Sequence, residues 1–228
     1  MLQGYGPALL GGLAATLQIA AGSLLVATGF GLLGASAKLS GNPVLRGIAA
    51  TYTTLIRGVP ELLLLLAVFY GGQTGLNALG GLLGWDYIDV NPSAAGMLTL
   101  GFIFGAYLTE TFRGAMLAVP RGQAEAAQAF GFAPWRVLWR ITLPQMVRHA
   151  IPGFANNWLV MLKATALVSV IGLDDMVHRA SLAAAATRQP FTFYAALAAI
   201  YLAITSLSLL ALHLVSRRFS LGVRTAEL

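Results

Sequence analysis

Five apolar stretches, each long enough to cross a lipid bilayer, constrain the fold of this chain more than any other feature. They lie at about residues 8–36, 45–72, 93–118, 146–172 and 190–216. A membrane-spanning helix needs about 20 apolar residues, whereas a strand of a transmembrane barrel needs only about ten. Backbone groups in lipid must also be hydrogen-bonded within the protein, which leaves helices or closed barrels. The stretches therefore predict an all-α integral membrane protein with about five transmembrane helices, forming a single domain over residues 1–228.

The composition agrees with a membrane protein and argues against several other classes. Hydrophobic residues make up 57% of the chain and charged residues 10%, whereas an ordinary soluble domain carries roughly a quarter charged residues. The net charge of +6 is spread over short loops, so we expect no nucleic-acid partner. Without cysteine, and with its histidines far apart at His149, His178 and His213, the chain is expected to hold no metal ion. No Ser/His/Asp arrangement stands out within the stretches, which argues against a membrane-embedded enzyme.

Loop charges predict which ends of the stretches face the cytoplasm, because lysine and arginine concentrate on that side of a membrane. The basic residues of the first loop, the third loop and the C-terminal tail are Lys38, Arg46, Arg121, Arg136, Arg140, Arg148, Arg217, Arg218 and Arg224. The second loop has no basic residue but contains Asp86 and Asp89. We therefore expect the N-terminus outside and the C-terminus in the cytoplasm, with the first stretch retained as a span rather than cleaved as a signal peptide.

The third loop, residues 121–145, has a pattern of its own. Gln123 to Phe130 is rich in helix-forming residues, and Glu125 is expected in the first turn, where a carboxylate complements the positive end of the helix. Gly131 can take the left-handed conformation that ends a helix, and Pro134 suits the first turn of the next one. The loop is thus predicted to form a short helix, a sharp turn and a second short helix.

Two interpretations of this loop follow from its chemistry. In the first, the helix protrudes into a groove of another protein, with small residues where the partner comes close and aromatic residues as anchors. In the second, an amphipathic helix lies on lipid headgroups with its arginines toward the phosphates. The residues concerned are Ala126, Ala127, Ala129, Phe130, Phe132 and Trp135. Physical chemistry alone favours neither interpretation.

The same loop carries a motif. Its residues are Glu125, Ala126, Ala127, Gly131, Ile141, Leu143 and Pro144. Their spacing resembles the EAA motif of the membrane subunits of ABC importers, in which EAA is followed by three residues, a glycine, nine residues and I-x-L-P. The resemblance implies a type I importer permease fold, in which this loop is a cytoplasmic coupling helix that docks on the ATPase through these residues.

Further segments extend the resemblance over nearly the whole chain. They are TLIRGVPELL, GAYLTETFRGA, AVPRGQAEAAQAFGF and NNWLVMLKATALVSVIGLDD. The chain is most similar to the Q-type permease subunits of histidine, lysine, arginine and ornithine uptake systems, and almost as similar to opine permease subunits. This implies a subunit of the bacterial inner membrane that translocates polar amino acids, with basic ones as the expected cargo, and has no enzymatic activity of its own.

The resemblance also implies partners that the chain does not contain. No G-x-x-x-x-G-K-[ST] phosphate loop occurs in the sequence, so we expect ATP and Mg²⁺ to be bound by a partner ATPase dimer. The other implied partners are an external solute-binding protein and a second permease subunit, homologous and non-identical. An ion-driven secondary transporter remains an alternative, but such transporters typically contain internal repeats, and none is visible here.

Arg57 and Glu61 are candidates for the substrate pathway, because charged residues inside a span usually face a watery cavity or the bundle interior. Their spacing of four places them on one face of a helix that Gly58 and Pro60 would loosen. In one interpretation Glu61 receives a cationic group of the cargo, while loosened backbone amides or Arg57 receive its carboxylate. In the other, the two side chains only neutralise each other.

Other polar residues of the spans have two interpretations as well. Asn156 and Lys163 share a helix face and either line the pathway or form hydrogen bonds between helices. Glu110 and Arg113 are expected to pair structurally or to contact a gate. Trp85, Tyr87 and Asp89 in the second loop are either part of an interfacial aromatic belt, which we favour, or a contact for the binding protein. Finally, the small-xxx-small spacing of Gly101 and Gly105 predicts close helix packing.

Overall fold

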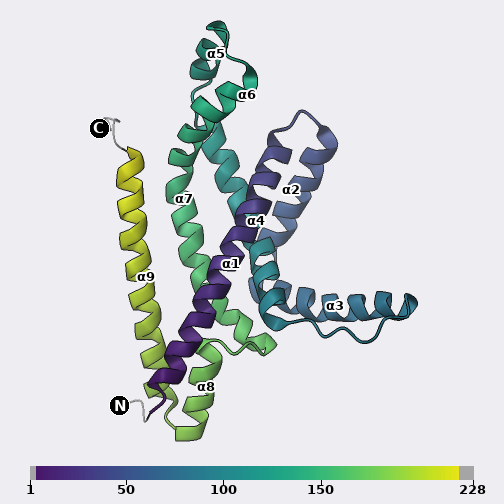
Figure 1. Ribbon diagram of the computed structural model, residues 1–228, viewed down its shortest axis with the longest axis vertical. Helices are drawn as coiled ribbons and strands as arrows, with labels where there is room; N and C mark the ends of the chain where they lie inside the picture. The colour runs from purple at the N-terminus through teal and green to yellow at the C-terminus, as the bar shows by residue number, and fades with distance from the viewer. Residues whose placement is uncertain (1–3, 221–228) are drawn as a thin grey trace.

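The computed structural model describes residues 4–220, and every regular element within them is a helix (Figure 1). The α-helices are α1 (Gly6–Leu39), α2 (Pro43–Gly58), α3 (Glu61–Leu82), α4 (Pro92–Leu117), α5 (Arg121–Ala129), α6 (Pro134–Val137), α7 (Leu143–Ala164), α8 (Met176–Thr187) and α9 (Pro190–Ser220). A π-helical turn, Leu138–Thr142, joins α6 to α7, and a 3₁₀ helix, Thr165–Ile171, follows α7. Arg224 and the side chain of Arg218 lie outside the described part of the chain.

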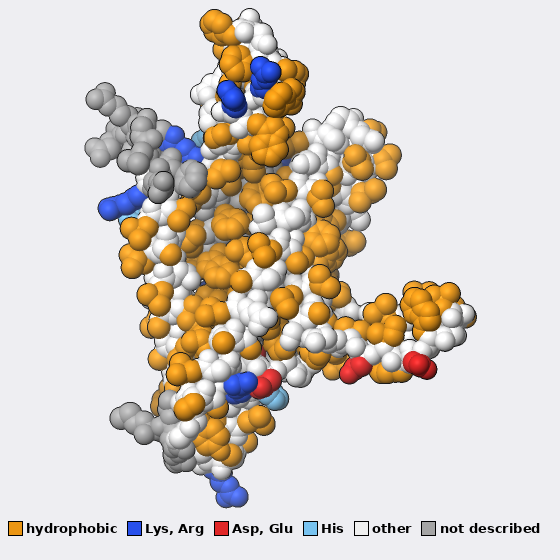
Figure 2. Space-filling view, in the orientation of Figure 1, with side chains coloured by type: hydrophobic (Ala, Val, Ile, Leu, Met, Phe, Trp, Pro, Cys, Tyr) orange, Lys and Arg blue, Asp and Glu red, His pale blue; other side chains and the backbone are white. Residues whose placement is uncertain are grey.

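Five helical segments within residues 4–220 are long and apolar enough to cross a membrane. They are α1, α3, α4, the continuous segment Pro134–Ile171 and α9 over Pro190–Arg217. Hydrophobic side chains cover much of the visible face of the long helices, whereas the few acidic side chains visible there lie in the lower half of the view (Figure 2). The all-α membrane fold expected from the sequence is confirmed.

The core forms where α1 crosses α4. Phe104 and Leu108 of α4 are almost fully buried there. A Cβ atom on Gly101 would lie 2.4 Å from Val26 Cγ1, so this position has no room for a side chain. A Cβ atom on Gly105 would likewise lie 2.5 Å from a side-chain atom of the facing helix. The close packing predicted from the spacing of these two glycines is confirmed.

The second apolar stretch, expected as a span over 45–72 loosened at Gly58 and Pro60, is divided at that place into two separate helices. α2 ends at Gly58, Val59 is extended with φ −114° and ψ 138°, and α3 begins after Pro60. A proline removes a backbone donor and disfavours the helical conformation in the residue before it. α2 has only 16 residues, too few to cross a bilayer. α3 instead continues to Leu82 and projects sideways from the other helices (Figure 1).

Polar side chains of α3 fix the loop that follows it. The backbone N–H of Ile88 donates to Asn77 Oδ1 at 2.8 Å, and that of Val90 donates to Gln73 Oε1 at 2.9 Å. The large aromatic side chains of this loop, including Tyr87, are left exposed. Their assignment to an aromatic belt or to a docking surface stays a prediction.

At the opposite end of the molecule from α5, the helix α8 packs between α1 and α9. Asp175 caps α8 by accepting a hydrogen bond from the backbone N–H of His178 at 2.8 Å. The side chain is almost fully buried, and burial raises the pKa of the Asp175 carboxyl. Arg179 donates two hydrogen bonds to Asp174, at 2.9 and 2.7 Å, and a third to the carbonyl of Ala8 on α1. These contacts attach α8 to the start of α1.

Candidate functional site

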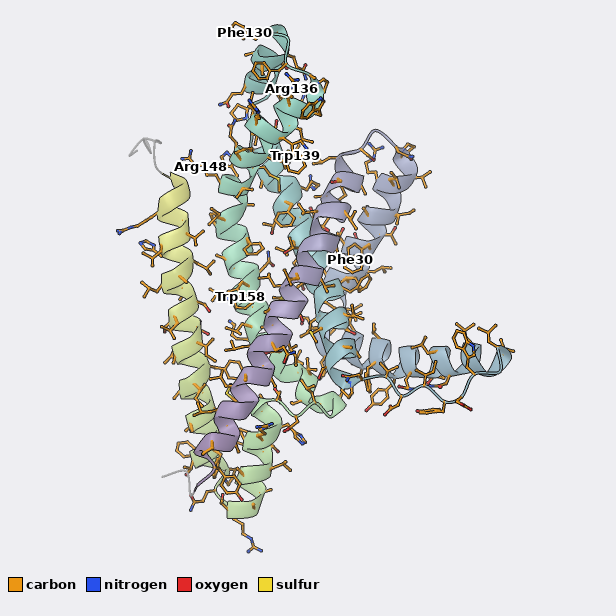
Figure 3. The ribbon with its side chains drawn as sticks, in the orientation of Figure 1. Phe30, Phe130, Arg136, Trp139, Arg148 and Trp158 are labelled. Carbon is orange, nitrogen blue, oxygen red and sulfur yellow. The ribbon has the colours of Figure 1, made fainter. Side chains whose placement is uncertain are left out.

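The third loop forms a protrusion at one end of the molecule, with Phe130 at its tip (Figure 3). α5 ends in a Schellman motif, in which the N–H of Phe132 donates to the carbonyl of Ala127 and that of Gly131 donates to Gln128. Gly131 has a φ of +82°, the left-handed conformation expected of it. Pro134 occupies the first turn of α6, also as expected. The predicted short helix and sharp turn are therefore confirmed.

Two details of the protrusion differ from the sequence-based expectation. α5 begins at Arg121 rather than Gln123, so Glu125 lies beyond its first turn. The second short helix is not separate, because α6 continues through the π-helical turn into α7. Pro144 has no N–H to donate to the carbonyl of Arg140, and the wider π-helical turn precedes it directly.

The motif residues are distributed over both helices of the protrusion and its base. Ala127 is buried, whereas Glu125 and Ala126 are exposed on α5. Ile141, Leu143 and Pro144 lie where the π-helical turn meets α7, the first two half-buried and the proline exposed. The motif thus joins an exposed helix face to the beginning of a membrane span.

Exposed aromatic side chains surround that helix face. Phe130 is 86% exposed, Trp139 67% and Trp135 62%, and the Arg136 guanidinium lies 5.3 Å from the centre of the Trp135 ring. Large apolar side chains and arginine are the residue types that dominate binding at protein interfaces. The same residue types also suit a headgroup layer, so the geometry alone is compatible with both interpretations of the loop.

An open cavity of about 490 Å³ lies between α1, α2 and α4. Its lining residues are Lys38, Thr53, Thr54, Arg57, Gly58, Tyr107 and Glu110. The volume is within the range of small-molecule sites, about 300–1,000 Å³. Both signs of charge are present in its wall, as a zwitterionic ligand requires.

Lys38 belongs to this wall rather than to a solvated loop. Its side chain is 13% exposed, pairs with Glu110 and donates to Thr53 Oγ1 at 2.6 Å. The second carboxylate oxygen of Glu110 accepts from Arg113 Nε at 2.9 Å, so the pairing predicted for Glu110 and Arg113 is confirmed. Three charges thus satisfy one another and tie α1, α2 and α4 together.

Arg57 and Glu61 do not share a helix face, which corrects the sequence-based expectation, because the chain breaks at Val59 and Pro60 between them. They also form no ion pair within 4.0 Å in the described part of the chain, so the direct neutralisation considered above is absent. Each contacts Tyr107 instead. The Arg57 guanidinium lies 5.5 Å from the centre of the Tyr107 ring, and the Tyr107 hydroxyl donates to Glu61 Oε1 at 3.3 Å.

Asn156 and Lys163 lie on α7 and do not line this cavity. Both are exposed, and within residues 4–220 neither side chain makes a hydrogen bond or an ion pair. Their neighbour Asn157 forms the contact between helices, donating to Thr111 Oγ1 on α4 at 2.9 Å. Of the four predicted pathway residues, only Arg57 lines this cavity, and Glu61 reaches it through its contact with Tyr107.

Sequence reasoning missed Lys38, Tyr107 and Glu110 as cavity residues. Tyr107 lies within the GAYLTETFRGA segment, but nothing in its local pattern distinguishes it from a packing residue.

The described residues contain no group of three or more histidine, cysteine, aspartate or glutamate side chains that could hold a metal ion.

Comparison with known proteins gives concordant matches. Residues 27–220 match the family model of the binding-protein-dependent transport system inner membrane component. The chain is 51% identical, over the full length of both chains, to the histidine/lysine/arginine/ornithine transport system permease protein HisQ of Salmonella typhimurium. It is 38% identical to the octopine transport system permease protein OccQ of Rhizobium meliloti, covering 97% of this chain and 94% of that protein.

Solved structures agree with these matches. A crystal structure of an amino acid ABC transporter with histidines has a chain that is 30% identical, with a TM-score of 0.80, covering 94% of this chain and 95% of that one. An inward-facing MetNI methionine ABC transporter has a TM-score of 0.74 at 16% identity, which supports the fold alone; the match covers 94% of this chain and 97% of that chain.

Proposed function

The chain belongs to the family of binding-protein-dependent transport system inner membrane components, and from this premise we propose that it translocates basic amino acids through the cavity beside Arg57 and Glu61. As a permease subunit of an amino-acid ABC importer, it is a transport component and not an enzyme. Its relatives function with an ATPase and a binding protein. The cargo, the residues that carry it and the remaining partners are part of the proposal.

The coupling role is assigned to the protrusion. Glu125, Ala126 and Ala127 of α5, with Gly131 at the turn, dock on a cytoplasmic ATPase dimer, which binds the ATP and Mg²⁺. Ile141, Leu143 and Pro144 transmit the movement to α7. The match to the EAA motif and the exposed aromatic side chains at the tip support this role. The protrusion is continuous with a membrane span, so a displacement at its tip would reach the bundle.

The cargo site is assigned from the charges in the cavity wall and from Glu61, which lies beside the wall in contact with Tyr107. Lys38, Glu110 and Arg113 satisfy one another. Arg57 and Glu61, by contrast, have no oppositely charged partner among residues 4–220. Glu61 receives the cationic group of the cargo and Arg57 its carboxylate. These two unpaired charges are the observation that carries the proposal, since ionisable groups in a span require a partner of some kind.

Asn156 and Lys163 extend the pathway along α7. Both are exposed on α7, within a segment long and apolar enough to cross a membrane, and lipid would be an unfavourable neighbour for either. The face they form is therefore turned toward water or toward a second permease subunit, which is homologous and non-identical. The protrusion and the C-terminus lie in the cytoplasm and the N-terminus outside, in agreement with the arginines of the third loop.

The test of this function is uptake into proteoliposomes that contain the complete complex, its binding protein and internal ATP. Glu61→Gln is expected to raise the KM for arginine, lysine and ornithine by about tenfold, because a hydrogen bond to a charged group contributes roughly 1.5–3 kcal/mol. Uptake of histidine in its neutral form should change less. Radiolabelled uptake at several pH values measures both effects.

The control is Asp86→Asn, which removes an exposed carboxylate outside the cavity. It should leave the KM values unchanged. An equal loss for all cargo with Glu61→Gln would assign this residue to structure alone. Uptake of opines in place of basic amino acids would keep the transport function and reject the proposed cargo. Octopine is the opine to measure, because the chain is similar to an octopine permease protein.

A further inference from the structure

Tyr107 of α4 lines the cavity and contacts both unpaired charges, Arg57 in the cavity wall and Glu61 beside it. The face of its ring is turned toward the Arg57 guanidinium, 5.5 Å from the ring centre, and its hydroxyl donates to Glu61 Oε1 at 3.3 Å. Arg57 is on α2 and Glu61 is the first residue of α3. One side chain therefore contacts both charges across the break in the second apolar stretch.

The two contacts of Tyr107 use different parts of the phenol. A cation is attracted to the electron-rich face of an aromatic ring, whereas the hydroxyl at its edge is a hydrogen-bond donor to a carboxylate. Arg57 and Glu61 are only four residues apart and carry opposite charges, so they would be expected to attract each other directly. Instead, each of them contacts a different part of Tyr107, and no ion pair within 4.0 Å joins them in the described part of the chain.

The position of Tyr107 is itself fixed by the core. Its ring packs 5.6 Å from that of Phe104, which is 1% exposed, and its backbone carbonyl accepts a hydrogen bond from Thr111 Oγ1 at 3.3 Å. Tyr107 also packs against the main apolar cluster of the bundle. A ring held in this way has little freedom to follow either charge.

We propose that Tyr107 is a positioning residue that sets the separation of the Arg57 guanidinium and the Glu61 carboxylate, and thereby makes the cavity selective for amino acids with a cationic side chain. This inference rests on the proposed function, in which those two groups receive the cargo. Tyr107 keeps them from neutralising each other and aims the carboxylate through its hydroxyl. A cargo with a carboxylate at one end and a cationic side chain at the other then pairs with both groups, its carboxylate with Arg57 and its cation with Glu61.

The test uses Tyr107→Phe in the complete complex in proteoliposomes. This change keeps the ring that holds Arg57 and removes only the hydrogen bond to Glu61. The KM for arginine, lysine and ornithine is expected to rise by about tenfold, with the maximal rate and the uptake of glutamine unchanged. Tyr70→Phe is the matched control, since Tyr70 is an exposed tyrosine of α3 that does not line the cavity.

A second variant, Glu61→Asp, withdraws the carboxylate from the hydroxyl by one methylene group. It should raise the KM for cationic cargo at least as much as Tyr107→Phe does, and the double variant Tyr107→Phe/Glu61→Asp should be no worse than Glu61→Asp alone, because the hydrogen bond between the two side chains is already lost in each single change. Additive effects on the KM would overturn the proposal. A fall in maximal rate that is equal for every cargo would also overturn it, since a packing role predicts that result.

Glu61→Gln, measured alongside, separates failure of this inference from failure of the proposed function. If Glu61→Gln raises the KM for cationic cargo and Tyr107→Phe does not, the cargo site stands and the positioning role is wrong. If Glu61→Gln changes nothing, the proposed cargo site fails, and the positioning role fails with it.

Discussion

Gly131 shows how one residue can shape a functional surface. Its positive φ closes the Schellman motif that ends α5, and exposed aromatic side chains lie on both sides of this turn, Phe130 before it and Phe132 after it. A Cβ atom at this position would meet nothing within 4 Å. The requirement for glycine is therefore conformational rather than steric, since a left-handed conformation costs other residues about 1–2 kcal/mol.

This distinction gives a prediction for coupling. Gly131→Asn is expected to retain most uptake, because asparagine tolerates the left-handed conformation, whereas Gly131→Val should abolish it. Gly131→Asp should also abolish uptake, since it adds a charge at the surface proposed to meet the ATPase. All three proteins should remain in the membrane, and ATP-driven uptake measured at matched membrane levels distinguishes them.

Full uptake by Gly131→Val would contradict the need for this turn. Gly122→Val on α5 provides a comparison, because Gly122 is helical and has nothing within 4 Å of its Cβ position.

Local sequence was sufficient for some residues and insufficient for others. Gly131 and Pro134 were placed correctly because turn and helix-start conformations depend on the residue itself. Lys38 was recognised only as a charge flanking the first loop, because its partner Glu110 is 72 positions away, and Tyr107 was missed because its contact with Glu61 spans 46 positions. Such contacts depend on how helices cross, which no local pattern records.

Among the elements, apolar length predicted most spans, and backbone chemistry explains the exception. The second stretch was expected to be one loosened helix, and its proline was recognised as the cause of weakness. What the apolar pattern did not reveal is that Val59 leaves the helical conformation altogether and that α3 takes a new direction. Apolar periodicity measures burial in lipid or protein and is insensitive to the direction of a helix axis.

The crossing of α1 and α8 offers a prediction at this scale. A Cβ atom on Gly12 would lie 2.7 Å from Met176 Cα, and backbone cannot move aside as a flexible side chain can. Gly12→Ala should therefore destabilise the protein by about 1–3 kcal/mol, as over-packing typically does. The measurement is thermal unfolding of the purified complex in lipid.

Gly29→Ala is the matched control on the same helix, because its Cβ would meet nothing within 4 Å. It should unfold at the temperature of the unaltered protein or slightly above it, since alanine favours a helix over glycine. An unfolding temperature for Gly12→Ala equal to that of the control would mean that α1 and α8 do not approach as closely as described.

As a whole, the molecule carries its two candidate sites in one connected helical framework. The protrusion continues into α7, α7 packs against α4, and α4 supplies Tyr107 and Glu110 to the cavity. A displacement of the protrusion could thus reach the cavity through two helices.

α3 leaves a large apolar surface outside this framework, because only 6% of its most apolar 18-residue segment is buried. That surface is consistent with a second permease subunit in the proposed assembly.

The central claim is that the protrusion couples ATP hydrolysis to translocation of basic amino acids. Its most direct test is the ATPase activity of the complete complex in lipid, with its binding protein, across arginine, lysine, ornithine, histidine, glutamine and opines. The account predicts stimulation by the first four compounds and little by the others. Stimulation by glutamine or opines alone would contradict the proposed cargo, and no stimulation by any compound would contradict the coupling role of the protrusion.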